Sequence, residues 1–347
     1  MTDTPLEILI KREIAANGPV TIARYMDVCL AHPKHGYYMT RDPLGAAGDF
    51  TTAPEISQMF GEIVGAWLVD AWDRIGRPPR FTLLECGPGR GTLMADILRV
   101  GALRPDFLNG ADIVLLETSP VLQNIQSKTL DTYPHRHATA LQDAIAPDLP
   151  ILLVGNEFFD ALPIHQYVRD SHGWRERLVG LDTSDRLVFG LGNMPVDLPQ
   201  QGPLHFYEAS PVSRALLKQV CAAIKDQGGA AIFIDYGSDD TADTGDTLQA
   251  VRQHRKSDPL RACGEADVTA HVDFAALRDV VIQAGLIPTI TTQSSFLQQN
   301  GLAARQAVLA RKSQDIAAKI QGEVDRLTHP DHMGTLFKVL IVRHDAG

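Results

Sequence analysis

The fold of this chain is decided by residues 81–93, FTLLECGPGRGTL, in which an apolar strand ending in an acid precedes a glycine-rich turn and the start of a helix. Gly87, Gly89 and Gly91 leave little side-chain bulk, so a ligand can lie against bare backbone. Open α/β sheets bind ligands at the carboxyl ends of their strands, which is where this turn stands. The pattern therefore predicts either a site for a nucleotide-like ligand or a tight turn without a ligand.

The glycine spacing separates the possible ligands. A dinucleotide fingerprint needs a third glycine where this chain has Thr92, and a phosphate-binding P-loop needs a G-K-[ST] sequence that does not follow the turn. What remains is E-x-G-x-G-x-G, with Glu85 before the glycines. An anionic side chain there disfavours a pyrophosphate and favours a ligand that carries an amino group and a sulfonium. We therefore expect S-adenosylmethionine as the cofactor.

Length and composition describe an ordinary globular protein. The 347 residues exceed one typical domain, and 44% of them are apolar and 21% charged. A net charge of −10 without a long basic run argues against nucleic-acid binding, which depends on clustered Lys and Arg. The four cysteines form no C-x-x-C pair and have no histidine spacing typical of zinc, so we expect no metal site.

Membrane-spanning and targeting segments have recognisable sequence patterns. No apolar run is long enough to span a bilayer, so we expect no membrane insertion. The first residues, MTDTPLEILIKREI, carry acids and lack both a signal-peptide core and the Arg-rich composition of a transit peptide. This pattern predicts a cytoplasmic protein of bacterial type. The sequence leaves the oligomeric state open.

Apolar runs alternate with helical patterns through most of the chain, which indicates an α/β fold with a mostly parallel sheet. Strands are expected at residues 82–85, 113–117, 137–140, 151–156, 230–235, 287–292 and 336–343. Helices are expected at the N-terminus, at 57–75 and at 302–327, and a loop at 238–269.

Short alternating strands joined by Gly and Asp turns between residues 163 and 191 indicate an antiparallel insertion. We therefore expect three parts. They are an N-terminal helical extension with an active-site loop at 1–80, an α/β core at 81–162 and 228–347, and an inserted segment on the substrate side at 163–227.

Two acids follow the next strands of the predicted sheet. Glu117 stands at a strand tip, where a carboxylate can accept hydrogen bonds from both ribose hydroxyls of an adenosine. Asp143 follows the short third strand, where its side chain can accept from an adenine amino group. Each acid has a plainer alternative, because Glu117 can cap a helix beside Ser119 and Asp143 can be a loop acid.

Asn156, Glu157 and Asp160 follow the strand at 151–156 in ILLVGNEFFDALP. Polar side chains walled by Phe158 and Phe159 can form a pocket for a guanidinium, whose planar fork makes bidentate hydrogen bonds to carboxylates. The alternative is a helix cap or a surface ion pair.

Two further segments can reach the same rim of the sheet. Residues 48–55, GDFTTAPE, can fold over the cofactor from the N-terminal side, or they form a structured loop that ends in a helix cap. Asp235 and Tyr236 end the strand at 230–235 and either shape the substrate pocket or support the turn. His135 and His137 are expected at the surface.

Several of these motifs, in this order, resemble the MidA family of class I S-adenosylmethionine-dependent methyltransferases. The matching stretches are HGYYMTRDPLGAAGDFTTAPEISQMFGE, LLECGPGRGTL, NEFFDALPIHQY, GWRE, IDYG and HVDF. The resemblance spans the chain from about Tyr25 to Val342. Mitochondrial members of this family assist the assembly of respiratory complex I by methylating an arginine on a core subunit.

The resemblance implies a Rossmann-like methyltransferase sheet with an antiparallel final strand, an N-terminal helical extension and an inserted segment near the substrate. It implies that one set of residues holds S-adenosylmethionine: Glu85, Gly87, Gly89, Glu117 and Asp143, with Gly48 and Asp49 matching a glycine–acid element. Asn156, Glu157 and Asp160 match the N-E-x-x-D motif of the family and are the implied catalytic residues.

The resulting hypothesis is methyl transfer to an arginine of a protein substrate, possible partners being complex I core subunits. Two alternatives stay open. The acceptor can be a small molecule or a nucleic-acid base, or the chain can be an assembly chaperone that binds the cofactor without turnover.

Overall fold

The computed structural model describes residues 3–42, 51–198, 205–240, 245–311 and 314–344. The chain forms two compact units, and each unit collects three stretches of sequence. The N-terminal unit comprises Met1–Phe50, Asp160–Arg214 and Asp240–Asp273. The C-terminal unit comprises Thr51–Phe159, Ala215–Asp239 and Phe274–Gly347.

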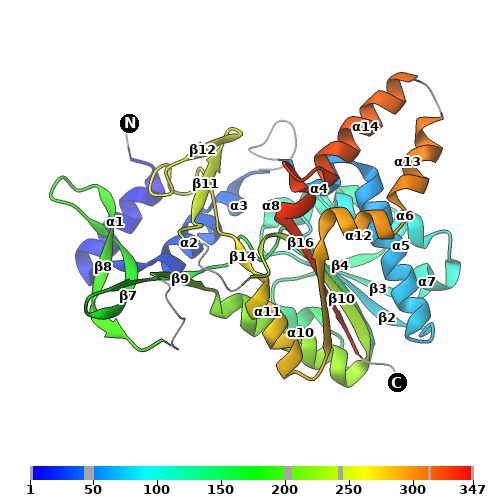
Figure 1. The fold of residues 1–347 in the computed structure, drawn as a ribbon, viewed down its shortest axis with the longest axis horizontal. Coiled ribbons are helices and arrows are strands. Elements are labelled where there is room, and N and C mark those ends of the chain that lie inside the picture. The colour runs from blue at the N-terminus through cyan, green and yellow to red at the C-terminus, as the bar shows by residue number, and fades with distance from the viewer. Residues whose placement is uncertain (1–2, 43–50, 199–204, 241–244, 312–313, 345–347) are drawn as a thin grey trace. The chain divides into compact units, whose positions relative to one another are not determined.

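A mixed sheet forms the centre of the C-terminal unit (Figure 1). Its strands, in spatial order, are β15 (Ile287–Thr292), β16 (Phe337–Arg343), β10 (Gly229–Ser238), β5 (Ile151–Asn156), β2 (Phe81–Cys86), β3 (Ala111–Leu116) and β4 (His135–Ala138). The pairs from β10 to β4 are parallel, whereas β16 runs antiparallel to both β10 and β15. This topology confirms the predicted Rossmann-like α/β fold with an antiparallel final strand.

Helices connect and cover these strands. They are α4 (Ala53–Ile56), α5 (Gln58–Arg74), α6 (Thr92–Gly101), α7 (Pro105–Gly110), α8 (Pro120–Thr129), α9 (Leu141–Ala144), α11 (Phe274–Gln283), α12 (Gln293–Gln299), α13 (Leu302–Ala310), α14 (Gln314–Thr328) and α15 (Met333–Leu336), with α10 (Pro211–Gln227) joining the two units in sequence. The single helix expected at 302–327 is wrong, because α13 ends at Ala310 and α14 begins at Gln314. The polar run RKSQD interrupts the apolar pattern there.

The central strands are covered on both faces. All six residues of β2 and all six of β5 are buried, as is typical of parallel strands with near-continuous apolar sequences such as FTLLEC and ILLVGN. On one face, Leu83, Val154 and Ile232 pack into a core with Phe60 of α5 and Ile97 of α6.

Two glycines of α5 bring this helix close to α6. A Cβ atom on Gly61 would lie 2.5 Å from the Cβ of Asp96, and one on Gly65 would lie 2.9 Å from the Cα of Ile97. The neighbour of Gly65 is backbone, which cannot move aside as a side chain can. These glycines therefore set how closely α5 packs against the helix that follows the glycine turn.

We expect Gly65→Ala to lower the free energy of unfolding by roughly 1–3 kcal/mol, because the added methyl group overpacks the contact with α6. Gly322→Ala in α14 is the matched control, since a Cβ there meets no atom within 4 Å. The control should gain up to about 1 kcal/mol from helix propensity. Denaturant unfolding of both variants checks this, and equal stabilities would contradict the close-packing argument.

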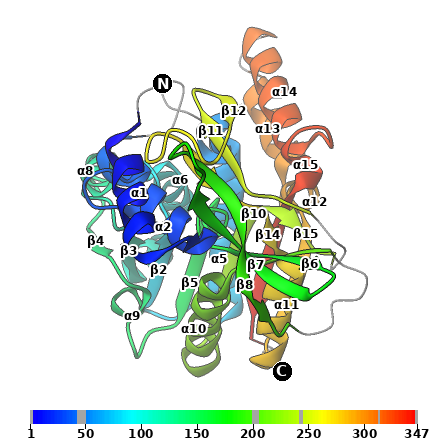
Figure 2. The same ribbon diagram turned by 90° about the vertical axis from the view of Figure 1, so that its left-hand side faces the viewer.

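The N-terminal unit packs helices against an antiparallel sheet (Figure 2). The strands are β1 (Val20–Thr21), β7 (Gly173–Leu181), β6 (His165–Asp170) and β9 (Phe206–Ala209) in spatial order, with β8 (Leu187–Val196) beside β7. Helices α1 (Pro5–Asn17), α2 (Ile22–Ala31) and α3 (Tyr37–Thr40) belong to this unit. Ile10 of α1, Met26 of α2 and Val179 of β7 share one core. The predicted helical N-terminus and antiparallel insertion are confirmed.

The start of α1 follows its predicted signals. The Thr4 hydroxyl accepts a hydrogen bond from the backbone N–H of Glu7 at 3.0 Å, and Pro5 occupies the first turn.

The loop expected at 238–269 is wrong in part, because this stretch contains a small antiparallel sheet. Its strands are β12 (Arg255–Ser257), β11 (Gln249–Arg252) and β13 (Asp267–Thr269) in spatial order. The hairpin turn between β11 and β12 consists of Gln253 and His254, both at positive φ (52° and 59°). Such turns usually carry Asn or Gly, so this sequence gives no hairpin signal. No helix in the described part of the chain is long and apolar enough to cross a bilayer.

Candidate active site

The glycine turn lies between β2 and α6. Gly87, Gly89 and Gly91 have φ values of 63°, 54° and 82°, a left-handed conformation that other residues adopt only with strain. A Cβ on Gly87 would lie 2.9 Å from the Cδ2 of Phe158. The strand before the turn pairs with β3 on one side and β5 on the other, and chain order reverses there. The turn thus stands at the switch point where open α/β sheets bind ligands.

Glu85 lies beneath this turn and is 2% exposed. Its Oε2 has no hydrogen-bond partner among the described residues. Burial raises the pKa of this carboxyl well above its usual range, a hydrogen bond from the Met94 amide opposes the shift, and the charges of Asp96 and Glu117 add to it. A buried acceptor beside a glycine-rich turn fits a ligand that brings positive charge and hydrogen-bond donors.

Glu117 directly follows β3 and belongs to a buried polar network. Its Oε1 accepts from the Ser119 N–H at 2.7 Å, and its Oε2 accepts from the Gln126 side-chain amide at 3.2 Å. Gln126 also donates to the Gly89 carbonyl at 2.7 Å, and its Oε1 lies 2.9 Å from His137 Nε2. Burial raises the pKa of Glu117, opposed by the bonds from Ser119 and Gln126. The network joins the tips of β3 and β4 to the glycine turn.

Gln126 is a residue that the sequence reasoning missed. It is fully buried in α8 four residues after Leu122, so both lie on the buried face of that helix. A glutamine at an apolar helical position was the available signal. His137 is half-buried in this network, which corrects the expectation that it lies at the surface.

Asp143 lies in α9, after β4, with its side chain exposed. Its carbonyl oxygen accepts from the Arg136 guanidinium at 2.8 Å. Gly48 and Asp49 lie outside the residues that the structure describes.

Asn156 ends β5 and Glu157 begins the turn that follows. Glu157 has φ 49°, an uncommon left-handed conformation for a residue with a side chain. Its Oε1 accepts from the Ala53 N–H at 3.1 Å and from the Asn156 side-chain amide at 3.2 Å. The Asn156 Oδ1 is buried without a partner among the described residues. The turn therefore holds a carboxylate and a buried amide oxygen side by side.

Helix α4 connects this turn with the glycine turn. Ala53 bonds Glu157, while the Glu55 carboxylate accepts from the Thr92 hydroxyl at 2.5 Å and lies 3.7 Å from the Arg90 guanidinium. Ala53 and Glu55 of α4 thus contact both turns.

Asp160 belongs to the N-terminal unit, whereas Asn156 and Glu157 belong to the C-terminal unit. Its carbonyl oxygen accepts from the Ala270 N–H at 3.0 Å. The Tyr38 hydroxyl donates to Asp267 Oδ1 at 2.9 Å. Burial first, and then the charges of Asp267 and Asp160, raise the pKa of Tyr38 well above its usual range. Asp160 thus lies close enough to Tyr38 for its charge to act on that phenol.

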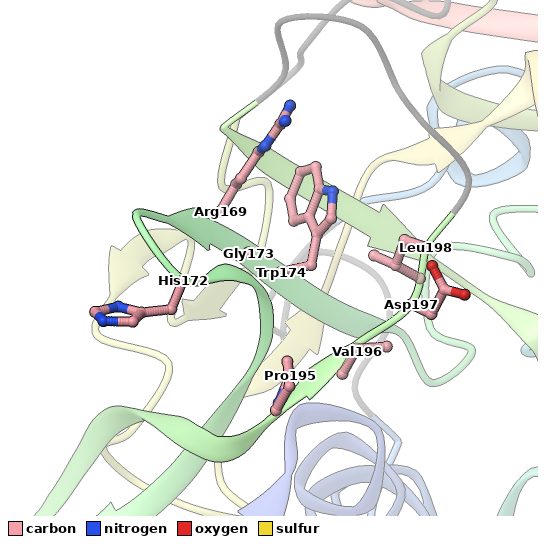
Figure 3. A pocket seen from close by; sticks show the side chains of 8 residues that line it. All are labelled: Arg169, His172, Gly173, Trp174, Pro195, Val196, Asp197 and Leu198. Atoms are coloured by element: carbon pink, nitrogen blue, oxygen red, sulfur yellow. The ribbon is translucent and has the colours of Figure 1, made fainter.

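A pocket of about 530 Å³ lies on the antiparallel sheet of the N-terminal unit (Figure 3). The indole of Trp174 and the side chain of Arg169 extend from the same side of the sheet, with Asp197 and Leu198 across from the indole. None of the predicted site residues lines this pocket. Among the described residues, no group of His, Cys, Asp and Glu is arranged to hold a metal ion.

The geometry of the C-terminal unit defines a class I S-adenosylmethionine-dependent methyltransferase, and comparisons with known proteins identify the family. A family profile described as an S-adenosyl-L-methionine-dependent methyltransferase matches residues 63–291. A crystal structure of a Burkholderia thailandensis protein bound to S-adenosylhomocysteine is 27% identical, with a TM-score of 0.86 over 99% of this chain and 95% of that one.

Two curated relatives carry the same name, protein arginine methyltransferase NDUFAF7, mitochondrial. The Danio rerio protein is 36% identical over 96% of this chain and 86% of its own length. The Homo sapiens protein is 36% identical over 96% of this chain and 82% of its own length. The chain therefore belongs to the MidA family of methyltransferases, and its cofactor is S-adenosylmethionine.

The predicted cytoplasmic localisation is wrong. It rested on the composition of the first residues, whereas the curated relatives are named as mitochondrial proteins.

Asp96 of α6 adds a second buried acid near the glycine turn. It is 3% exposed, its Oδ1 accepts from the Arg99 guanidinium at 2.6 Å, and its Oδ2 has no partner among the described residues. Burial raises its pKa to about 6, against the effect of Arg99 and with a contribution from the charges of Glu62 and Glu55.

The pKa of Asp96 predicts a pH-dependent stability. Because the folded-state pKa lies above the unfolded one, the stability present in acid is lost as the pH rises through about 6. Asp96→Asn removes this titration, so its stability relative to the wild type should improve by roughly 1–3 kcal/mol between about pH 4 and pH 8. Asp70→Asn, at an exposed ion pair with Arg74, is the control and should show little change. Equal pH dependence of wild type and Asp96→Asn would contradict the assignment.

Proposed function

We propose that this enzyme transfers a methyl group from S-adenosylmethionine to an arginine nitrogen of a protein. The relatives named protein arginine methyltransferase support this acceptor. The observation that carries the proposal is the turn after β5, where the Glu157 carboxylate and the buried Asn156 Oδ1 stand together. This pair offers acceptor oxygens of the kind that recognises the N–H groups of a guanidinium.

The turn after β5 neighbours the glycine turn after β2. Cys86 and Gly155 are partners in the parallel pairing of the two strands, and Phe158 packs against Gly87. The groups proposed for the acceptor and for the cofactor therefore share one edge of the sheet. Positioning two reactants this closely can supply much of the rate of a displacement.

We assign cofactor contacts to Glu85, Gly87, Gly89, Glu117 and Asp143. Glu85, Gly87 and Gly89 would hold the amino-acid part of the cofactor. Glu117 would accept hydrogen bonds from the ribose, since each of its carboxylate oxygens has a lone-pair site beyond its present bond. Asp143 is exposed beyond β4, where its side chain would accept from the adenine. Gly48 and Asp49 keep their proposed cofactor role on the sequence motif alone.

Bound S-adenosylmethionine supplies an electrophilic methyl group on a sulfonium. The chain's residues would do the rest. Glu157 holds the guanidinium and draws its positive charge toward one end, and the Asn156 Oδ1 fixes its orientation. A guanidinium keeps its proton up to about pH 12, so proton loss follows methyl transfer rather than preceding it. Asp160 is proposed as a second carboxylate for the acceptor on the strength of the N-E-x-x-D motif, and the inserted segment 163–227 as part of acceptor recognition.

A complex I core subunit is the proposed protein substrate, in support of complex assembly. Mass spectrometry of arginine methylation on complex I subunits, in cells with and without this enzyme, tests the proposal. One methylated arginine should disappear without the enzyme. An unchanged pattern would overturn the complex I assignment. Label from methyl-labelled S-adenosylmethionine that enters only small molecules of a lysate would overturn the protein acceptor as well.

We expect Glu117→Gln to weaken S-adenosylmethionine binding by roughly tenfold or more, because a neutral amide has one acceptor oxygen where the carboxylate has two. Calorimetric titration with S-adenosylmethionine measures the change. Glu323→Gln in α14 is the control, since Glu323 pairs only loosely with Lys319, at 3.8 Å. Unchanged affinity in Glu117→Gln would remove Glu117 from the cofactor site.

Glu157→Gln should keep S-adenosylmethionine affinity and lose methyl transfer by about 100-fold or more, because the amide keeps an oxygen for the Ala53 N–H but carries no charge. Binding is measured by titration and transfer by label incorporation into protein, with Glu323→Gln again as the control. Full transfer activity in Glu157→Gln would remove Glu157 from the mechanism.

A further inference from the structure

Asp235 of β10 places a buried carboxylate against the turn that carries Glu157. It is 1% exposed. Its Oδ2 accepts from the backbone N–H groups of Phe158 at 3.1 Å and Phe159 at 2.9 Å, and its Oδ1 accepts from the N–H of Tyr236 at 2.9 Å. The Asp235 side chain thus accepts hydrogen bonds from three backbone N–H groups, two in the turn after β5 and one in β10.

The backbone conformation of the turn after β5 depends on its hydrogen bonds to Asp235. Glu157 is held at φ 49°, and its own N–H donates to the Ile234 carbonyl at 2.8 Å. A left-handed residue with a side chain persists only where its surroundings fix it. The next two amides, those of Phe158 and Phe159, both donate to Asp235. Without Asp235, the amide of Phe159, a residue that is 3% exposed, would be left as a costly unpaired donor.

A carboxylate suits this position better than its amide analogue. Donors approach both oxygens of Asp235, and an ionised carboxylate accepts at each without carrying a donor of its own. An asparagine would direct its NH2 group at one of these N–H groups. Hydrogen bonds to a charged acceptor are also stronger than those to a neutral one.

We propose that Asp235 is a positioning residue for methyl transfer. Its carboxylate holds the turn from Glu157 to Phe159 in the conformation in which the Glu157 carboxylate meets Ala53 and Asn156. Asp235 acts through the peptide backbone of the turn. The inference rests on the proposed role of Glu157 in the acceptor site.

The test compares Asp235→Asn with Asp239→Asn. Asp239 follows the same strand, is half-exposed and pairs with Lys338 at 3.5 Å, so the control makes the same chemical change just beyond the turn contacts. We measure the initial rate of label transfer from methyl-labelled S-adenosylmethionine to proteins of an extract from cells that lack this enzyme. Asp235→Asn should lower the rate by about tenfold or more while S-adenosylmethionine affinity changes by less than about threefold. Asp239→Asn should match the wild type.

A double-mutant cycle separates positioning from general destabilisation. If Asp235 acts through Glu157, then Asp235→Asn should lower the rate much less in the Glu157→Gln background than in the wild type. Equal losses in both backgrounds would overturn the proposal, because they would mean that Asp235 acts elsewhere. A wild-type rate for Asp235→Asn would overturn it while leaving the arginine methyltransferase proposal standing.

Failure of the proposed function gives a different pattern. A wild-type rate for Glu157→Gln removes the role of Glu157, and the Asp235 inference falls with it.

A second variant, Asp235→Ser, leaves room for water and replaces Asp235→Asn in the test if Asp235→Asn does not fold. Amide hydrogen exchange of the variant gives a second readout. The amides of Phe158 and Phe159 should lose protection, while the amide of Ile232, which lies in the same strand as Asp235, stays protected. Retained protection at both amides would overturn the proposal.

Discussion

The parallel pairing of β2 with β5 is the constraint on which the candidate site depends. It places the carboxyl ends of the two strands next to each other, with Cys86 opposite Gly155. Gly155 is required at this point, since a Cβ there would lie 2.8 Å from the Phe233 ring. One strand delivers the glycine turn and the other delivers Asn156 and Glu157. In the proposed mechanism, neither turn alone could bring the methyl donor and its acceptor together.

Several buried acidic side chains lie around the glycine turn, and burying their ionised form lowers the stability of the folded state. Burial raises the pKa of Glu85, Asp96 and Glu117, and in each case the protein's own donors offset only part of the effect. Clusters of buried acids with raised pKa values are common at functional sites. A ligand with a sulfonium and an ammonium group would add positive charge beside Glu85, whose Oε2 has no partner among the described residues. These buried acids support the proposed role of the site in binding a cationic ligand.

Some parts of the candidate site could be predicted from local sequence patterns, and others depend on tertiary contacts. The glycine turn was predictable because each of its glycines is needed for a local reason, the positive φ. The pairing of Glu55 with Thr92 was not, because 37 residues separate them and no periodicity connects them. The same holds for Gln126, whose amide bridges Gly89 and Glu117. The hairpin at Gln253 and His254 escaped prediction for another reason, since surrounding strands impose a turn that its residues do not favour.

The sequence by itself determined the strand pattern of the core, the E-x-G-x-G-x-G turn and the choice of cofactor, because burial periodicity and backbone sterics are local properties. Strand β2 was expected at 82–85 and spans Phe81–Cys86. Only the tertiary structure decided what surrounds the turn after β5. Asp235 lies 76 residues after Phe159 and Ala53 lies 104 residues before Glu157. Hydrogen bonds over such separations exist only once the sheet has brought the strand ends together, so no local pattern records them.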